Sequence, residues 1–311
     1  MKILLIILII LITVFLIYAV VGGLYFFDQS VRRKPRRDDE IPTDNKYSSV
    51  LRRKKQVGID WLLSQNAENV YITSFDNLKL CAKVLENDPK KIMIMMHGFR
   101  AEDFSDFSVS SKLFYDDGYT IILPHQRAHD QSEGKYLSYG INERKDCKMW
   151  VDWAINHYGN DCKIVLSGVS MGCATVLATL GYNLPTNVKA CIADCGYTTP
   201  REIFRHVISK DKKLLPFPVV DVCNFICKIR AKYSIDEYSP LKAMETNKIP
   251  TIFIHGEQDR YVPTYMSKVN FEACKADKEL LIVKGARHAA SFETDSELCF
   301  KKSKAFIEKY M

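Results

Sequence analysis

Short apolar runs alternate with longer amphipathic segments along most of this 311-residue chain. Residues 162–167 form an apolar, β-branched run typical of a buried strand, and an apolar segment typical of a helix follows at residues 173–180. In residues 140–158 the apolar side chains recur at helical spacing, which predicts an amphipathic helix. Residues 70–85 predict an opening hairpin. This alternation predicts an α/β fold with a mostly parallel central sheet flanked by helices.

The strongest apolar signal lies at the start of the chain. Residues 3–27 form an uncharged apolar run of 25 residues. As a helix, this run is long enough to cross a hydrocarbon core of about 30 Å with some tilt. It is too long for the apolar region of a signal peptide, and Val21-Gly22-Gly23 is only a weak cleavage site. We therefore predict an N-terminal transmembrane helix, with a cleaved signal sequence as the alternative.

Three segments follow from this division of the chain. Residues 3–27 are the predicted transmembrane anchor, residues 28–44 a basic juxtamembrane linker, and residues 45–311 a single α/β domain. Within that domain, residues at about 197–239 form a long insertion that predicts a cap of short helices over the ligand pocket. Such a cap would select the substrate, although most of its apolar residues are expected to pack the cap onto the sheet.

Basic residues are concentrated next to the apolar run. The chain carries a net charge of +7, and residues 29–56 hold ten Lys or Arg against four Asp or Glu. The remaining domain is close to neutral, which argues against a nucleic-acid partner. Five basic residues follow the apolar run, and the positive-inside rule then places the domain in the cytoplasm: Arg32, Arg33, Lys34, Arg36 and Arg37. These charges would face anionic lipid headgroups, or alternatively form a solvated linker.

The ten cysteines and the histidines give little support for a metal site. Several cysteines lie in apolar runs as small hydrophobes, and unpaired thiols again favour the cytoplasm. Three pairs of possible ligands are four residues apart: Cys191 with Cys195, Cys223 with Cys227, and His125 with His129. The cysteine pairs lack the spacing and histidine partners of a zinc site, and the histidine pair has no carboxylate cluster beyond Asp130. We expect no metal and, without a nucleotide-binding motif, no cofactor.

A serine flanked by glycines lies where the predicted strand 162–167 meets its helix. Ser170 is preceded by Gly168 and followed by Gly172, the pattern of a nucleophile elbow. A serine on such a turn has a strained backbone, and side chains at the glycine positions would collide with the strand or the helix. The same turn places the amide of Met171 at a helix N-terminus, where it can receive negative charge.

A nucleophilic serine needs a base, and the base needs a carboxylate to orient it. Asp259 lies on a loop just past the predicted strand 249–255, and His288 lies on a loop past the predicted strand 279–283. Loops at the carboxyl ends of parallel strands meet at one edge of a sheet. We therefore predict that Ser170, His288 and Asp259 form a catalytic triad.

Other assignments of the acid remain open at the level of sequence. Glu257 lies on the same loop as Asp259, and Asp194 ends the predicted strand 188–193. Asp259 itself would alternatively cap the helix that begins near Pro263.

A second amide is required to stabilise the oxyanion. The predicted strand 90–96 is followed at once by His97, Gly98 and Phe99. Gly98 permits a sharp turn that would point the amide of Phe99 at the substrate carbonyl, so the oxyanion hole is expected to consist of the Phe99 and Met171 amides. The alternative is a plain turn at the end of the strand, which we favour for the second such dipeptide, His255-Gly256.

These motifs resemble the α/β-hydrolase superfamily, and in particular membrane-anchored bacterial prolyl-oligopeptidase-like serine hydrolases. The resemblance covers about residues 45–311 and rests on His97-Gly98-Phe99, Arg127-x-x-x-x-Ser132-x-Gly134, Gly168 to Gly172, Gly256-x-x-Asp259-x-x-Val262-Pro263 and His288. It implies an α/β-hydrolase fold and cofactor-independent acyl hydrolysis, and it leaves the substrate open. One loop departs from the usual pattern, because His125, Ala128 and Asp130 replace an Asp and two Gly. Asp130 is expected to preserve the turn, since Asp tolerates a positive φ.

The sequence thus predicts a membrane-anchored serine hydrolase that cleaves carboxylic ester, thioester or related acyl bonds through an acyl-enzyme. Lipid-like esters are the preferred substrate class, because the anchor would hold the site near a bilayer. A serine peptidase of the prolyl-oligopeptidase type is the alternative within the same chemistry. A catalytically silent, membrane-tethered interaction module is the alternative from another class, and it would predict a missing member of the triad.

Overall fold

A computed structural model describes residues 1–34, 49–101, 105–210 and 212–311. Eight strands form one sheet in the order β1-β2-β4-β3-β5-β6-β7-β8. The first two neighbouring pairs, β1 with β2 and β2 with β4, are antiparallel, and all the other neighbours are parallel. The strands are β1 (Glu68–Thr73), β2 (Lys79–Leu85), β3 (Asp88–Met96), β4 (Tyr119–Pro124), β5 (Lys163–Val169), β6 (Val188–Asp194), β7 (Thr251–Gly256) and β8 (Lys278–Val283).

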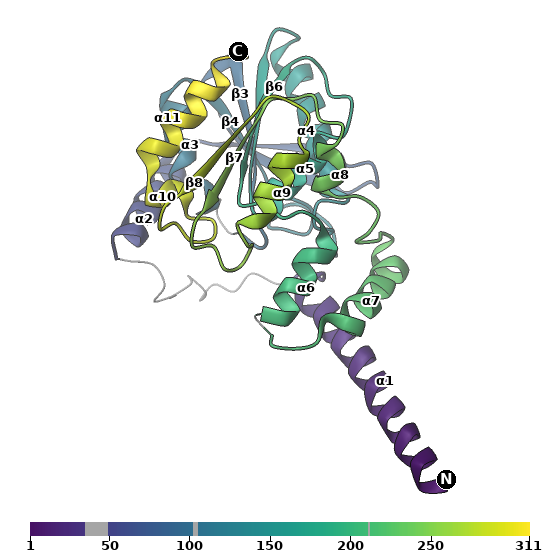
Figure 1. Cartoon of the computed structure of the whole chain (residues 1–311). Coiled ribbons are helices and arrows are strands. Elements are labelled where there is room, and N and C mark those ends of the chain that lie inside the picture. The colour runs from purple at the N-terminus through teal and green to yellow at the C-terminus, as the bar shows by residue number, and fades with distance from the viewer. Residues whose placement is uncertain (35–48, 102–104, 211) are drawn as a thin grey trace.

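Helices cover both faces of this sheet (Figure 1). One face is covered by α2 (Ser49–Ser64), α3 (Ser110–Asp116), α10 (Ser291–Thr294) and α11 (Ser296–Ile307). The opposite face is covered by α4 (Glu143–Tyr158), α5 (Met171–Thr179), α8 (Pro240–Met244) and α9 (Tyr265–Ala273). A short 3₁₀ turn, η1 (Ser105–Phe107), precedes α3.

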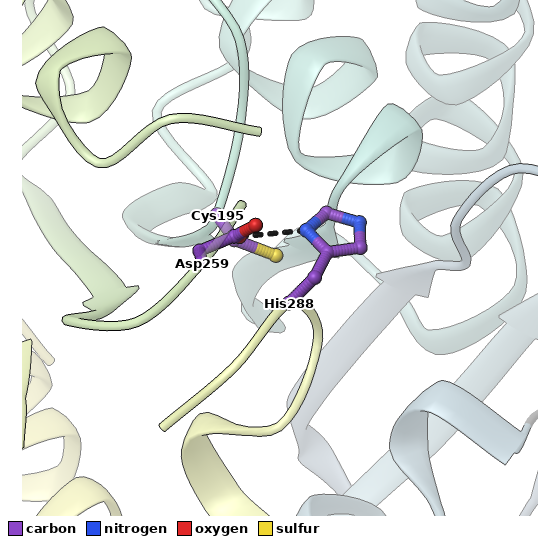
Figure 2. Close-up of side chains that lie close together, drawn as sticks. All are labelled: Cys195, Asp259 and His288. Atoms are coloured by element: carbon purple, nitrogen blue, oxygen red, sulfur yellow. Dashed lines mark hydrogen bonds and ion pairs between the residues drawn. The ribbon is translucent and has the colours of Figure 1, made fainter. Parts of the chain in front are cut away.

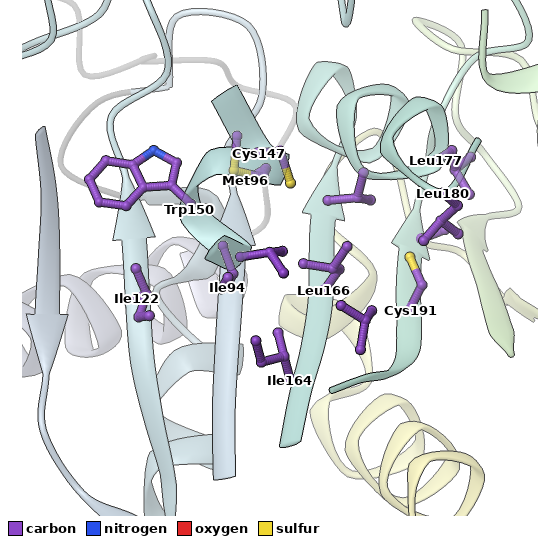
Figure 3. Packing of buried hydrophobic residues seen from close by; sticks show 14 of the residues in the cluster. Ile94, Met96, Ile122, Cys147, Trp150, Ile164, Leu166, Leu177, Leu180 and Cys191 are labelled. Carbon is purple, nitrogen blue, oxygen red and sulfur yellow. The ribbon is translucent and has the colours of Figure 1, made fainter. Parts of the chain in front are cut away.

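The central strands are buried on both faces because helices lie on each side. In β3, for example, Ile92, Ile94 and Met96 join one apolar cluster, while the intervening Met93 and Met95 join the other. Alternate side chains of a strand point to opposite faces, so a strand covered on both sides is apolar throughout. Figure 3 shows the first cluster, where side chains of β3, β4 and β5 lie under α4 and α5.

The insertion between β6 and β7 forms a separate helical layer. It carries α6 (Pro200–Lys210) and α7 (Pro216–Ile226), and a single π turn, η2 (Cys227–Ala231), ends α7. The N-terminal helix α1 (Lys2–Ser30) projects from the domain and runs beside α7 with its second half (Figure 1). A third apolar cluster joins α1, α6 and α7 to Met171 and Val262 at the edge of the sheet. The insertion therefore lies between the apolar helix α1 and the carboxyl edge of the sheet.

The predicted fold class is confirmed, including the parallel sheet, the opening hairpin and a helical insertion. Two boundaries differ from the prediction. The amphipathic helix begins at Glu143 rather than at residue 140, because Gly140 has a non-helical φ of 92° and lies in a turn that continues to Asn142. The apolar helix continues to Ser30, past the predicted end at residue 27. Most of the predicted linker 28–44, including Arg36 and Arg37, lies outside the described residues.

Candidate active site

The turn between β5 and α5 has the strained geometry that the glycine pattern predicts. Ser170 has φ and ψ of 55° and −115°, outside the ordinary regions for an L-residue. A Cβ at Gly168 would lie 2.4 Å from the carbonyl oxygen of Gly172, and a Cβ at Gly172 would lie 1.7 Å from that of Met96. No side chain fits at either position. The glycines are thus required by close backbone packing, and Ser170 is lifted above the sheet edge.

Ser170, His288 and Asp259 lie in one hydrogen-bonded line. Nδ1 of His288 is 2.7 Å from Oδ2 of Asp259, and Nε2 of His288 is 2.9 Å from Oγ of Ser170. Because an ionised carboxylate only accepts, Nδ1 carries the proton, and Nε2 is left to accept the hydroxyl proton of Ser170. Three residues from three separate loops therefore converge with the polarity that proton transfer from the serine requires.

Asp259 is held as an anion by several donors. Its Oδ1 accepts the amides of Tyr261 and Val262, each at 2.9 Å, and its Oδ2 lies 3.2 Å from Nε2 of His255. Burial alone would raise the pKa of Asp259, but hydrogen bonds from His255 and His288 hold that pKa well below its usual range. The carboxylate therefore stays ionised and fixes the imidazole of His288.

The two alternative acids have other partners. Oδ1 of Asp194 accepts the hydroxyl of Ser291 at 2.8 Å, and burial raises the pKa of Asp194 to about 6. Oε2 of Glu257 accepts the amide of Gly285 at 3.1 Å. The geometry therefore favours Asp259 as the acid.

Two residues beside the candidate triad were not predicted from the sequence to be near it. Figure 2 shows Cys195 next to the hydrogen-bonded Asp259 and His288, and one polar atom from each lies within 4.8 Å of the others. Burial raises the pKa of the Cys195 thiol well above its usual range, so the thiol is neutral beside the ionised carboxylate. His255, interpreted from the sequence as part of a plain turn, instead braces the acid. The expected absence of a metal stays a prediction.

The loop after β3 places the second candidate oxyanion donor next to the serine. A Cβ at Gly98 would lie 3.4 Å from Cβ of Ser170, so this loop passes directly over the nucleophile. The amide of Gly98 itself donates to Oδ2 of Asp106 at 2.7 Å. Among the residues that the structure describes, the amides of Phe99 and Met171 have no hydrogen-bond acceptor. Both amides are thus left available, as the predicted oxyanion hole requires.

Buried histidines stiffen this loop. Nε2 of His97 accepts the amide of Gln126 at 3.0 Å, and Nε2 of His129 accepts the amide of Arg100 at 3.1 Å. Burial lowers the pKa of His97 and lowers that of His129 to about 3, so both rings are neutral. Because each ring is committed to backbone groups, His129 is a structural residue, and it does not share a ligand site with His125.

The departure from the usual pattern after β4 preserves the backbone. Ala128 and Asp130 have φ values of 62° and 37°, at the two positions where the motif that the sequence resembles has glycine. Oδ2 of Asp130 lies 3.1 Å from Nδ1 of His125. The expectation that Asp130 keeps the turn is confirmed.

The end of α1 reaches the oxyanion loop, which the sequence did not indicate. A guanidinium nitrogen of Arg100, next to Phe99, donates to the carbonyls of Gln29 at 2.8 Å and Arg32 at 3.1 Å. The hydroxyl of Tyr139 donates to the carbonyl of Ser30 at 2.9 Å, and the Tyr139 ring stacks with Phe99 at 5.8 Å between centroids. The apolar helix is therefore part of the scaffold of the site.

Comparisons with known proteins agree with this geometry. Residues 105–311 match the model of the prolyl oligopeptidase family. The uncharacterized protein YqkD of Bacillus subtilis (strain 168) is 27% identical over 225 residues, which cover 72% of this chain and 73% of YqkD.

Solved structures share the fold. The Pyrococcus furiosus esterase Pf2001 superposes with a TM-score of 0.65 at 24% identity, covering 80% of this chain and 94% of the esterase. An acylaminoacyl peptidase from Pyrococcus horikoshii superposes with a TM-score of 0.57 at 17% identity, covering 78% of this chain and 41% of the peptidase. The α/β-hydrolase fold, the serine on its elbow and the family match together lead to one conclusion: this chain is a hydrolase and belongs to the prolyl oligopeptidase family.

Proposed function

We propose that the protein is a serine hydrolase that cleaves carboxylic ester or related acyl bonds through an acyl-enzyme. The hydrogen-bonded line from Ser170 through His288 to Asp259 carries this proposal. Oγ of Ser170 attacks the substrate carbonyl while Nε2 of His288 takes its proton, and the Asp259 carboxylate stabilises the imidazolium. His288 then protonates the leaving group, and a water molecule activated by His288 hydrolyses the acyl-serine.

The amides of Phe99 and Met171 are proposed to bind the oxyanion of the tetrahedral intermediate. Their lack of acceptors within the described part of the chain, and their place beside Ser170, support this role. Loss of one such donor typically lowers the rate about 10²- to 10³-fold.

A lipid-like acyl ester is the substrate class that the surroundings of the site favour. Phe99 stacks on Tyr139, and the ring of Phe204 from α6 packs edge-on against Tyr139 with centroids 4.6 Å apart. The rings of Phe204 and Phe26 of α1 also pack edge-on, with centroids 5.0 Å apart. Apolar side chains therefore continue from the site through the cap to the membrane-type helix. The structural similarity to an esterase supports the same class.

We further propose that α1 is retained as a membrane anchor and that the hydrolase domain lies in the cytoplasm. α1 is long and apolar enough to cross a membrane, a property that it shares with signal sequences. Its retention is supported by Phe26 and Phe27, which are 4% and 3% exposed, because cleavage near Gly23 would separate this buried end from the rest of the helix. The basic residues after α1 support the cytoplasmic side.

Labelling with a fluorophosphonate probe tests the nucleophile. We expect the wild type to be labelled and Ser170→Ala to be unlabelled, because only an activated serine reacts at an appreciable rate. Ser64→Ala, which changes an exposed serine at the end of α2, is the control and should be labelled like the wild type. Equal weak labelling of the wild type and Ser170→Ala would contradict the proposal.

Peptide hydrolysis is the second candidate, favoured by the family match and by the similarity to an acylaminoacyl peptidase. Turnover of nitrophenyl esters with a series of acyl-chain lengths, compared with a peptide anilide, separates the two. We expect kcat/KM to rise with acyl length and to exceed that for the anilide. The reverse order would make the protein a peptidase.

A further inference from the structure

Large apolar side chains gather on the outer surface of the cap. Five of them, here called the cap ridge, are exposed: Leu214 at 43%, Leu215 at 73%, Phe217 at 68%, Phe225 at 62% and Ile229 at 53%. All five lie between residues 214 and 229, in and around α7 and η2. Several large exposed apolar side chains within one short segment indicate an interaction surface.

The cap ridge is continuous with α1. The hydroxyl of Tyr18 donates to the carbonyl of Leu215 at 2.7 Å, and the rings of Phe15 and Phe217 have centroids 6.3 Å apart. Further along α1, a Cβ at Gly23 would lie 2.4 Å from a methyl carbon of Val222, so the two helices approach closely through a small residue. The position of the cap relative to a bilayer is therefore fixed by the position of α1.

The length of α1 decides how deep the cap lies. Residues 3–14, which precede the first contact with the ridge, would span only about 18 Å at ~1.5 Å per residue, well short of a hydrocarbon core of ~30 Å. A spanning α1 must therefore include the stretch beside Phe217 and Leu215 within the core. With Ile3 at the far boundary of the core, Phe15 lies about 18 Å along the helix axis. Its neighbour Phe217 is then on the order of 10 Å inside the core boundary that faces the hydrolase domain.

Charged groups lie at the part of α1 that would reach the lipid headgroups. Asp28 is about 38 Å along the axis from Ile3, outside a core of ~30 Å and near the edge of a bilayer of ~40–45 Å. At this level a cavity of about 750 Å³ lies between the end of α1 and the domain. Its lining includes four basic residues: Arg32, Arg33, Lys135 and Arg230. Basic side chains at the membrane surface attract anionic lipids.

We propose that the part of the cap ridge beside Phe15 and Tyr18, namely Leu215 and Phe217, is embedded in the hydrocarbon of an anionic phospholipid bilayer, with Phe225, Ile229 and the basic cavity at headgroup level. This inference rests on the proposed anchoring by α1 and extends it, because the cap itself becomes a membrane-inserted element beside the active site. A substrate in the same leaflet would then meet the cap without leaving the bilayer.

Depth-dependent quenching by brominated phospholipids tests the inference on the full chain in vesicles of phosphatidylcholine and phosphatidylglycerol. Phe217→Trp and Leu215→Trp report on the cap ridge, Leu8→Trp reports on the span, and Lys302→Trp on α11 reports on a solvent-exposed surface. The emission of the native Trp61, Trp150 and Trp153 is subtracted with the wild type. We expect both ridge variants to lose fluorescence to acyl-chain bromines to an extent comparable with Leu8→Trp, and Lys302→Trp to lose none.

The outcomes separate this inference from the anchoring on which it rests. If Leu8→Trp is quenched while Phe217→Trp and Leu215→Trp behave like Lys302→Trp, α1 enters the bilayer without the cap, and the embedded cap is overturned. If Leu8→Trp is also unquenched, the anchoring fails as well. Two ridge positions are used so that a single variant that fails to fold does not decide the result.

Discussion

The catalytic centre and the joint between α1 and the cap are held together by different physical forces. At the centre, Ser170, His288 and Asp259 are joined by two short hydrogen bonds. At the joint, apolar side chains of α1 and α7 pack around Gly22 and Gly23. Directional bonds fail when one group is changed, whereas an apolar contact loses a share of its free energy with each change. Substitutions should therefore separate the two regions.

The two regions nevertheless contact each other. Arg100 lies next to Phe99, the proposed oxyanion donor, and donates to backbone carbonyls at the end of α1. A disturbance of the joint can reach the proposed chemistry through such contacts and through the apolar cluster that joins α1 to Met171. The comparison therefore predicts complete loss of activity for changes at the centre and partial loss for changes at the joint.

The largest effect is expected from Asp259→Asn. An amide in place of the carboxylate cannot hold His288 in the tautomer that accepts from Ser170, and such a change lowers kcat about 10⁴-fold. Steady-state hydrolysis of a soluble nitrophenyl ester measures it. Glu257→Gln, on the same loop, is the matched control and should keep the wild-type rate. A rate for Asp259→Asn near that of the wild type would assign the acid elsewhere.

The same variant should change the acid stability. The pKa of Asp259 is lower in the folded protein than its ordinary value of 3.8. Its ionisation therefore stabilises the fold above about pH 4, and this contribution is lost as the pH falls through the lower folded value. Chemical unfolding at a series of acidic pH values should show a shallower loss of stability below pH 4 for Asp259→Asn than for the wild type. Equal slopes would show that Asp259 is not held as an anion.

Sequence alone predicts the centre far better than the joint, and the reason is physical. The elbow around Ser170 and the loops of Asp259 and His288 are local patterns, whose glycines and strand ends are visible within a few residues. The contact between α1 and α7 joins segments that lie far apart in the chain, and no short pattern records it. Gly22 and Gly23 were interpreted as part of a weak cleavage site, whereas the structure uses them for close helix packing.

The residues that lie beside the Asp259 carboxylate were not predicted, for a related reason. His255 and Cys195 end buried strands, where a polar or small residue is ordinary, so their sequence gives no sign of the carboxylate beside them. The four-residue spacing from His255 to Asp259 is the one signal available, and it gains meaning only once the loop is known to fold back. Arg100 lies next to a recognised motif, but its acceptors are backbone carbonyls, which carry no sequence signal.

A smaller effect is expected from Gly23→Leu at the joint. The new side chain would meet Val222, whose Cβ lies 2.6 Å from the added Cβ, and overpacking of this kind costs about 1–3 kcal/mol. We expect a lower thermal unfolding midpoint. We also expect kcat/KM to fall about tenfold, because Arg100 links α1 to the loop of Phe99 and a loss of ~1.4 kcal/mol of transition-state stabilisation corresponds to a factor of ten. Val20→Leu, on an exposed face of the same helix, should be neutral in both measurements. Unchanged activity with lowered stability would show that α1 and the oxyanion loop are not coupled.

The smallest effect on activity is expected from a buried acid that is not part of the candidate triad. Glu293 on α10 is 3% exposed, and within the described residues its Oε1 has no hydrogen-bond partner. Burial raises the pKa of Glu293 from 4.5 to about 7. Between these values the folded state keeps a proton that the unfolded state releases, so the stability falls as the pH rises through this window, by at most about 3 kcal/mol.

Glu293→Gln removes this titration and should flatten the dependence of unfolding free energy on pH between 4.5 and 7, while Glu297→Gln on the exposed start of α11 should keep it. Urea unfolding at several pH values measures the slopes. The joint between α1 and the cap is built from apolar side chains and contributes no such slope. A Glu293→Gln variant that retains the wild-type slope would show that a group other than Glu293 titrates in this range.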